Sequence, residues 1–250
     1  MKKLIVGIAL VLTASTSAFA SAAPVKSIVL VHGAFADGSG WQPVATILKK
    51  DGYDVSVVQE PETSLADDVK ATDRLVDMQA GSSILVGHSY GGTVITEAGN
   101  DPKVAGLVYV AAFQPDAGES TADLNKKTPP AATSFKVSAD GFVYLDPAKF
   151  HADFCADLPT AQADFMSTSQ VFTSGAQGFG AKITTASWKS KPTWAVVAKD
   201  DRAINPELER FMYKRSGSKT VEIKASHAVY VSHAREVAKV IEEAAQVSGK

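Results

Sequence analysis

The sequence predicts an α/β protein with a doubly wound, mostly parallel sheet and a helical cap insertion. First, short and continuously apolar runs recur along the chain, which is the pattern of strands buried on both faces of a parallel sheet. Second, amphipathic helical patterns separate these runs, and this alternation implies right-handed β-α-β crossovers. Third, the alternation stops between Phe113 and Trp188 and then resumes, so this segment is expected to be an insertion.

The strand and helix patterns can be placed one after another. Apolar runs predict strands over residues 27–31, 53–58, 82–86, 104–110, 193–198 and 219–223. Helices are expected between them over residues 42–50, from Ser64 to about 79, from the turn at residues 87–92 to Gly99, over 206–215 and over 232–246. Ser64 supports the second helix as an N-cap, and Pro206 suits the first turn of the fourth.

The segment from Phe113 to Trp188 combines prolines with many aromatic residues. Disordered linkers are poor in aromatic residues, so this insertion is expected to fold. It begins after a strand, at the edge of the sheet where loops carry function. We therefore expect residues 113–188 to form a cap over the functional site, inside one domain of residues 24–250.

The first 22 residues read as a secretory signal peptide. Lys2 and Lys3 precede an apolar run from Leu4 to Leu12, and small residues with an Ala-x-Ala pattern follow. The run is shorter than the roughly 20 apolar residues that span a bilayer, so no membrane anchor is expected after cleavage. The mature protein is expected to be exported, to the periplasm or outside the cell.

The composition excludes several classes of partner. The formal net charge is −2 and the basic residues form no cluster, which argues against nucleic acid and anionic membranes as partners. The single cysteine, Cys155, cannot form an internal disulfide. A small-molecule partner remains, and the sequence leaves the oligomeric state open.

The most informative stretch, residues 84–95, reads ILVGHSYGGTVI. It is an apolar strand, a Gly-x-Ser-x-Gly turn and the start of a helix, which is the nucleophile-elbow pattern. A serine on such a sharp turn leaves no room for side chains two residues away, and Gly87 and Gly91 provide that room. The pattern predicts Ser89 as a nucleophile and the Tyr90 N–H, at a helix N-terminus, as an oxyanion donor.

A serine nucleophile needs a histidine base, and the base needs an acid that orients it. In this topology the acid and then the histidine follow the serine, each on a loop just after a strand. The loop after Ile223 contains His227. The loop after Ala198 contains both Asp200 and Asp201, and the residues alone do not decide between them.

The chain resembles the α/β-hydrolase superfamily, in particular a bacterial esterase family related to plant methylesterases and hydroxynitrile lyases. The resemblance extends from about Lys26 to Ala245 and lies in the motifs HGAFADGSGW, SLADDV, GHSYGG, DPKVAGLVYVAAF, DDRAINPELERFM and SHAVYVSH. It implies that Asp201, which precedes a two-residue gap and Ile204, is the triad acid. It also implies that the Ala34 N–H is the second oxyanion donor.

The remaining candidates concern the pocket and the other histidines. Phe35, Phe113 and the cap residue His151 are expected to line the substrate pocket. His88 is expected to pack behind the elbow, and His32 to brace the glycine-rich loop. No histidines and carboxylates show metal-ligand spacing in the sequence, so neither a metal nor another cofactor is expected.

These residues favour a serine hydrolase that cleaves small carboxylic esters through an acyl-enzyme. One alternative is a hydroxynitrile lyase, but its relatives carry a lysine and a threonine where this chain has Ala228 and Gly33. Cleavage of an amide, a lactone or a carbon–carbon bond is a second alternative, because the cap and not the triad selects the leaving group. Non-catalytic binding of a small molecule is a third.

Overall fold

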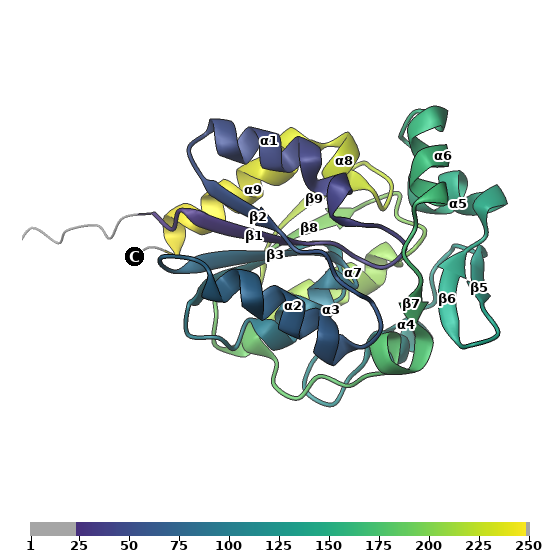
Figure 1. Cartoon of the computed structure of the whole chain (residues 1–250), viewed down its shortest axis with the longest axis horizontal. Coiled ribbons are helices and arrows are strands. Elements are labelled where there is room, and N and C mark those ends of the chain that lie inside the picture. The colour runs from purple at the N-terminus through teal and green to yellow at the C-terminus, as the bar shows by residue number, and fades with distance from the viewer. Residues whose placement is uncertain (1–23, 249–250) are drawn as a thin grey trace, which may run out of the picture.

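The computed structural model describes residues 24–248 and has a six-stranded sheet at its centre, in the order β2-β1-β3-β4-β8-β9 (Figure 1). Every neighbouring pair in this sheet is parallel. The strands are β1 (Ser27–Val31), β2 (Asp54–Val57), β3 (Ser83–Ser89), β4 (Val104–Ala112), β8 (Thr193–Ala198) and β9 (Lys219–Ile223). The predicted doubly wound parallel sheet is therefore confirmed.

Helices cover both faces of the sheet. In Figure 1, α1 (Gln42–Lys50), α8 (Val229–Ser232) and α9 (Ala234–Val247) lie on one face, and α2 (Leu65–Asp77), α3 (Gly91–Ala98) and α7 (Pro206–Ser216) on the other. The sequence places their ends: the Ser64 side chain caps α2, and Asn205 caps α7 next to Pro206. Two short 3₁₀ helices, η1 (Gly38–Trp41) and η3 (Ser187–Lys189), complete this part of the chain.

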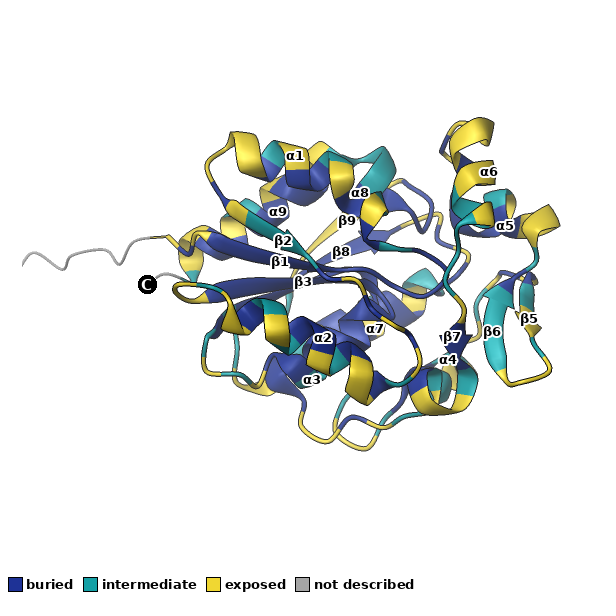
Figure 2. Cartoon of the chain, viewed as in Figure 1, coloured by how far each residue is buried: buried dark blue, intermediate teal, exposed yellow. Residues whose placement is uncertain are grey.

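The inner strands form the core. Every residue of β1, β3 and β8 is buried, whereas the edge strand β9 is mostly exposed and carries Lys219 and Glu222 (Figure 2). Charged residues on an edge strand discourage pairing with another chain. The sequence alternates little within the buried strands because both of their faces meet helices.

The chain between β4 and β8 forms a cap beyond the carboxyl ends of the strands (Figure 1). It contains α4 (Thr121–Lys127), α5 (Pro147–Phe154), α6 (Thr160–Thr168) and a π-helical turn η2 (Gly175–Phe179). It also contains a three-stranded antiparallel sheet of β5 (Phe135–Val137), β6 (Phe142–Leu145) and β7 (Thr173–Ser174). The expected helical cap is thus a mixed one. Gly141, at φ +88°, allows the tight turn between β5 and β6.

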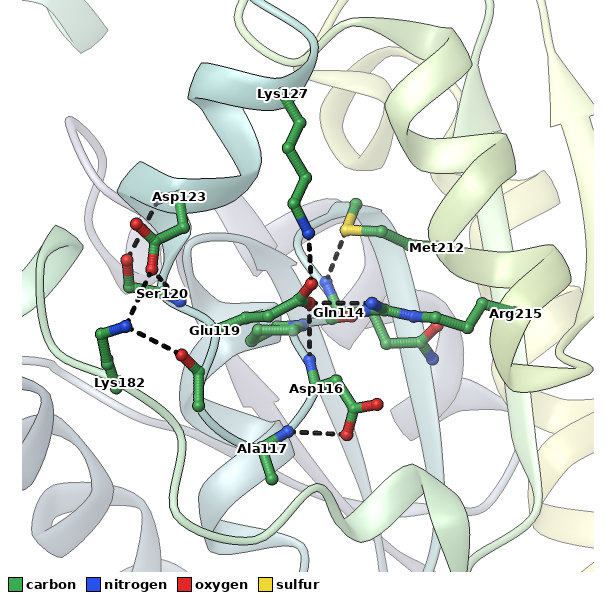
Figure 3. Close-up of polar contacts among 12 residues, drawn as sticks. Gln114, Asp116, Ala117, Glu119, Ser120, Asp123, Lys127, Lys182, Met212 and Arg215 are labelled. Atoms are coloured by element: carbon green, nitrogen blue, oxygen red, sulfur yellow. Dashed lines mark hydrogen bonds and ion pairs between the residues drawn. The ribbon is translucent and has the colours of Figure 1, made fainter.

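A polar network joins α4 of the cap to α7 of the core (Figure 3). The Glu119 carboxylate accepts from Lys127 Nζ at 2.6 Å, from Arg215 at 2.8 Å and from the Asp116 N–H at 2.9 Å. Lys182 donates to the Gly118 carbonyl oxygen at 3.1 Å. These bonds fix the start of the cap at the position where the chain leaves β4.

The sequence also made predictions about the N-terminus and about Cys155. The predicted signal peptide, residues 1–22, lies outside the described residues. Within residues 24–248, none of the helices has the length and apolar character needed to cross a bilayer. Cys155 is fully buried, and burial raises the pKa of its thiol to about 12, so it packs as an apolar side chain.

Candidate active site

The turn after β3 has the strained geometry that its sequence predicts. Ser89 adopts φ +53°, a left-handed conformation that is uncommon for residues other than glycine. A Cβ at Gly87 would lie 2.5 Å from the Gly91 carbonyl oxygen, so a side chain there would collide with the helix that follows. The neighbouring strand accommodates the turn by a bulge: His88 pairs with Val110 and Ser89 pairs with Ala112.

Two backbone N–H groups lie close to Ser89, because Ala34 lines the same cavity and Tyr90 is the next residue in the chain. Tyr90 stands at the N-cap of α3, and Ala34 follows β1 in a loop that Phe35 turns at φ +65°. Neither the Ala34 N–H nor the Tyr90 N–H donates to a backbone oxygen among residues 24–248. Unpaired donors beside a nucleophile have the arrangement of an oxyanion hole.

The loops after β8 and β9 bring an acid and a histidine into contact. His227 Nδ1 lies 2.5 Å from Asp201 Oδ2, and both side chains are buried. Because Nδ1 donates to the carboxylate, Nε2 keeps its lone pair. Nε2 has no hydrogen-bond partner in the described part of the chain, and His227 lines the same cavity as Ser89. The imidazole is therefore oriented as a base toward that cavity.

The contacts in the loop after β8 distinguish the two candidate acids, Asp200 and Asp201. Asp201 Oδ1 accepts the N–H groups of Ala203 at 2.7 Å and Ile204 at 2.8 Å, so its own loop holds the carboxylate in place. Asp200 is exposed, and its N–H bonds the Ala225 carbonyl oxygen. Of the two, Asp201 is the carboxylate that contacts His227.

His88 packs behind His227, as the sequence suggested. The two rings lie 4.6 Å apart, and His88 Nε2 lies 3.0 Å from the His227 carbonyl oxygen. Burial holds the pKa of His88 well below its usual value, and the nearby His227 acts in the same direction. His88 is therefore neutral and can donate to this carbonyl, which fixes the backbone of His227.

A cavity of about 270 Å³ opens at Ser89 and His227 between the core and the cap. Phe35 and Phe113 line it, as predicted. The cap and the strand end that leads into it contribute mostly apolar side chains: Phe113, Thr121, Ala122, Asn125, Pro130, Phe135, Val143 and Phe179. Ser89 is only 7% exposed because this cap covers the turn.

One predicted pocket residue is placed elsewhere. His151 does not line the cavity; its Nε2 lies 2.9 Å from the Leu158 carbonyl oxygen, within the cap. The prediction rested on the residue type and on the position in the cap, but the imidazole of His151 bonds a carbonyl oxygen in the turn between α5 and α6 instead. Asn125 was not singled out from the sequence, and it is a polar side chain that lines the cavity without a partner for its Oδ1 in residues 24–248.

A buried polar cluster lies beside the loop that follows β1 and contains Ala34. Ligand atoms of His32, Glu60 and Glu62 lie within 4.8 Å of one another, a proximity that the sequence did not reveal. The cluster fits a metal ion poorly, because His32 Nε2 accepts the Glu60 N–H at 3.0 Å. The neutral imidazole then carries its proton on Nδ1, 3.4 Å from Glu62, and has no free lone pair for a metal.

The same cluster holds Tyr90, the residue after Ser89. The Tyr90 hydroxyl donates to Asp68 at 3.0 Å, and Asp68 accepts the Glu62 N–H at 2.8 Å. Glu62 also bonds the Thr173 hydroxyl of β7. The cluster therefore links the turn at Ser89, the loop after β2 and the cap.

Comparison with known protein families identifies the family of this chain. The model of the alpha/beta hydrolase family matches residues 28–240, and the chain belongs to this family. Its curated relatives are named as hydrolases and esterases, which supports a hydrolase or esterase function.

Two relatives show the range of similarity. A carbendazim hydrolyzing esterase of Nocardioides sp. (strain SG-4G) is 35% identical over 123 residues, which is 43% of this chain and 50% of that protein. The chain thus aligns with only half the length of this esterase. A pyrethroid hydrolase of Sphingobium wenxiniae is 28% identical over 251 residues, covering 87% of this chain and 86% of the relative.

Solved structures share the fold. A pyrethroid hydrolase from Sphingobium faniae JZ-2 superposes with a TM-score of 0.74 at 24% identity, over 88% of this chain and 97% of that one. An extracellular alpha/beta-hydrolase from a Paenibacillus species, described as sharing homology with tobacco salicylic acid binding protein 2, reaches 0.73 at 20% identity, over 89% and 99%. At these identities the likeness establishes the fold alone.

Proposed function

We propose that the protein is an exported carboxylesterase that hydrolyses small carboxylic esters with Ser89, His227 and Asp201. The observation that carries this proposal is the meeting of three features at one cavity. These are a strained serine turn, an acid-bound imidazole with an unpaired Nε2, and two unpaired backbone N–H groups. Acyl transfer through a serine needs a nucleophile, a base and oxyanion donors, and these three features offer a candidate for each.

The first half-reaction forms the acyl-enzyme. Ser89 Oγ attacks the ester carbonyl carbon while His227 Nε2 takes the hydroxyl proton. The N–H groups of Ala34 and Tyr90 stabilise the negative oxygen of the tetrahedral intermediate. When this intermediate collapses, the carbon–oxygen bond to the alcohol breaks and His227 returns the proton to the departing oxygen.

The second half-reaction releases the acid. A water molecule attacks the acyl carbon, and His227 Nε2 takes one of its protons. Collapse of the second tetrahedral intermediate breaks the bond to Ser89 Oγ, which regains the proton. Asp201 stays ionised and stabilises the imidazolium in both halves.

The lining of the cavity supports a small or aromatic ester. Phe35, Phe113, Phe135 and Phe179 present apolar surfaces around Ser89, and aromatic side chains favour flat apolar groups. Asn125 offers the substrate one polar partner from the cap. Two relatives, named as a carbendazim hydrolyzing esterase and a pyrethroid hydrolase, agree with aromatic substrates.

The lyase alternative has little support at the positions that distinguish it. A Cβ at Gly33 would lie 2.5 Å from Ser89 Cβ, so this backbone has no room for the threonine expected of a lyase. Ala228, after the histidine, has no amino group. The residues that would hold a cyanohydrin are therefore missing.

A burst experiment tests the proposal and separates an esterase from a binding protein. The protein lacking residues 1–22 is mixed with excess p-nitrophenyl acetate, and p-nitrophenol release is followed in the first turnovers. We expect turnover, with an acetyl group on the peptide containing Ser89 after acid quenching. The Ser89→Ala variant is the control. Binding without release of p-nitrophenol would overturn the proposal.

A further inference from the structure

A second buried acid lies beside the proposed triad. Glu209, in the first turns of α7, is fully buried, and its Oε2 accepts the Ala198 N–H at 3.2 Å. Its Oε1 is buried and receives no hydrogen bond from any amide or hydroxyl group in residues 24–248. The Ala198 carbonyl oxygen in turn accepts the Asp201 N–H at 3.2 Å, so both acids are tied to the same residue at the end of β8, and the Asp201 side chain is a hydrogen-bond partner for the Glu209 carboxyl.

Two carboxyl groups in contact inside a protein favour a state in which one of them is protonated, because two buried negative charges would repel each other. The hydrogen bonds decide which group holds it. Asp201 accepts three donors, from Ala203, Ile204 and His227, which stabilise its charged form. Glu209 accepts one, from Ala198.

The other charged groups around Glu209 do not neutralise it. Arg210 points to Glu207 and Glu222 and bonds both carboxylates. The Tyr213 hydroxyl donates to the Ala112 carbonyl oxygen at 2.9 Å. Burial, followed by the charge of Asp201, raises the pKa of Glu209 well above its usual value.

We propose that Glu209 is a positioning residue, whose neutral carboxyl group donates a hydrogen bond to the Asp201 carboxylate and so holds it against His227. The role rests on the proposed function, because it serves the same triad. Glu209 touches neither the substrate cavity nor Ser89. It ties the acid to α7 and to the end of β8, so the orientation of His227 depends on a helix as well as on a loop.

Two variants separate hydrogen bonding from packing. Glu209→Gln keeps the shape, an acceptor for Ala198 and an N–H donor for Asp201, without a titratable proton. Glu209→Leu keeps most of the volume and removes the donor. We expect kcat for p-nitrophenyl acetate to stay within about threefold in Glu209→Gln and to fall about tenfold or more in Glu209→Leu, with KM little changed. The acid limb of the kcat/KM profile should shift in Glu209→Leu only.

Two spectroscopic measurements need no substrate, so they stand even if the esterase proposal fails. The infrared difference spectrum of wild type minus Glu209→Gln at neutral pH should show the carbonyl stretch of one protonated carboxylic acid. The downfield proton resonance of His227 Nδ1–H should move in Glu209→Leu and remain in place in Glu209→Gln. If Glu209→Leu does not fold, the infrared band and the kcat of Glu209→Gln decide.

The proposal is overturned if the difference spectrum lacks the protonated-acid band. It is also overturned if Glu209→Leu keeps the wild-type pH profile and downfield resonance, or if Glu209→Gln is as impaired as Glu209→Leu. Absence of esterase activity combined with an intact band would overturn the proposed function and leave the carboxyl pair standing.

Discussion

The backbone at Ser89 combines strain with a small side chain that contributes little to packing. Its φ of +53° is set by the turn and by the bulge in β4, not by the hydroxyl group. We therefore expect Ser89→Ala to keep the melting temperature within a few degrees while kcat falls on the order of 10⁴-fold or more. Calorimetry and p-nitrophenyl acetate hydrolysis measure the two effects. Activity above a tenth of wild type would exclude Ser89 as the nucleophile.

The two neighbouring aspartates provide a matched pair of variants. Asp201→Asn removes the charge that faces His227 Nδ1 at 2.5 Å, so kcat/KM is expected to fall at least about 100-fold. Asp200→Asn changes an exposed side chain and should stay within about twofold. Both rates are measured at pH 8, with circular dichroism as a check on folding. Equal and mild losses would mean that neither aspartate is the triad acid.

Local motifs point to some residues of the candidate site and give no signal for others. Ser89 and His227 follow from the order of strands, glycines and loops, because each stands directly after a strand that its own pattern reveals. Asp201 could be chosen as the acid only through the family resemblance, since Asp200 has the same chemistry one position away. Glu209 gave no signal, because only the packing of α7 on the end of β8 brings it to Asp201.

At the scale of elements, the parallel sheet could be predicted and the cap only in outline. Buried strands carry long apolar runs, which short sequence windows detect. The cap strands β5 and β6 are short and half exposed, so their patterns are weak, and the expected helical cap missed the small sheet. His151 was misplaced for the same reason: its partner, the Leu158 carbonyl oxygen, is fixed by the turn between α5 and α6.

Glu60, in the loop after β2, is expected to make the stability of the protein depend on pH. Burial raises the pKa of Glu60 well above its usual value, and the neighbouring Asp68 and Glu62 carboxyls add to the effect while His32 opposes it. Folded Glu60 therefore holds its proton at a pH where the unfolded chain, with a pKa of about 4.3, has lost it. Stability is expected to fall as pH rises from about 4.3 to the higher pKa of the folded state.

Glu60→Gln removes this pH-dependent cost. The variant should gain stability over wild type at pH 8, by about 1.4 kcal/mol for each unit by which the folded pKa is raised, and the gain should shrink toward pH 4. Urea unfolding at several pH values measures it, and Glu236→Gln, at an exposed position in α9, is the control. A variant less stable than wild type at pH 8 would show instead that ionised Glu60 pairs with protonated His32.

At the scale of the whole molecule, the core carries Ser89, Asp201 and His227, and the cap carries most of the apolar lining of the cavity. β3, β8 and β9 end at the same edge of the sheet, so Ser89, Asp201 and His227 meet although they are far apart in the chain. The cap closes over this edge and is held to α7 by Glu119 and Arg215 (Figure 3). In the proposed reaction, the cavity beneath this cap limits the size of the ester.

This arrangement predicts the ester that is hydrolysed best. A cavity of about 270 Å³ lined by Phe35, Phe135 and Phe179 holds a short acyl chain or one aromatic ring, but no long extended chain. We expect kcat/KM for p-nitrophenyl esters to be highest between acetate and butyrate and to fall at least about tenfold by the octanoate. Phe179→Ala removes a ring from the cavity lining, so it should enlarge the cavity and move the optimum to longer acyl chains. Phe165→Ala, on an exposed face of the cap, should leave the optimum unchanged. A wild-type profile that rises toward palmitate would contradict the closed-cavity interpretation, because a long chain needs an open groove.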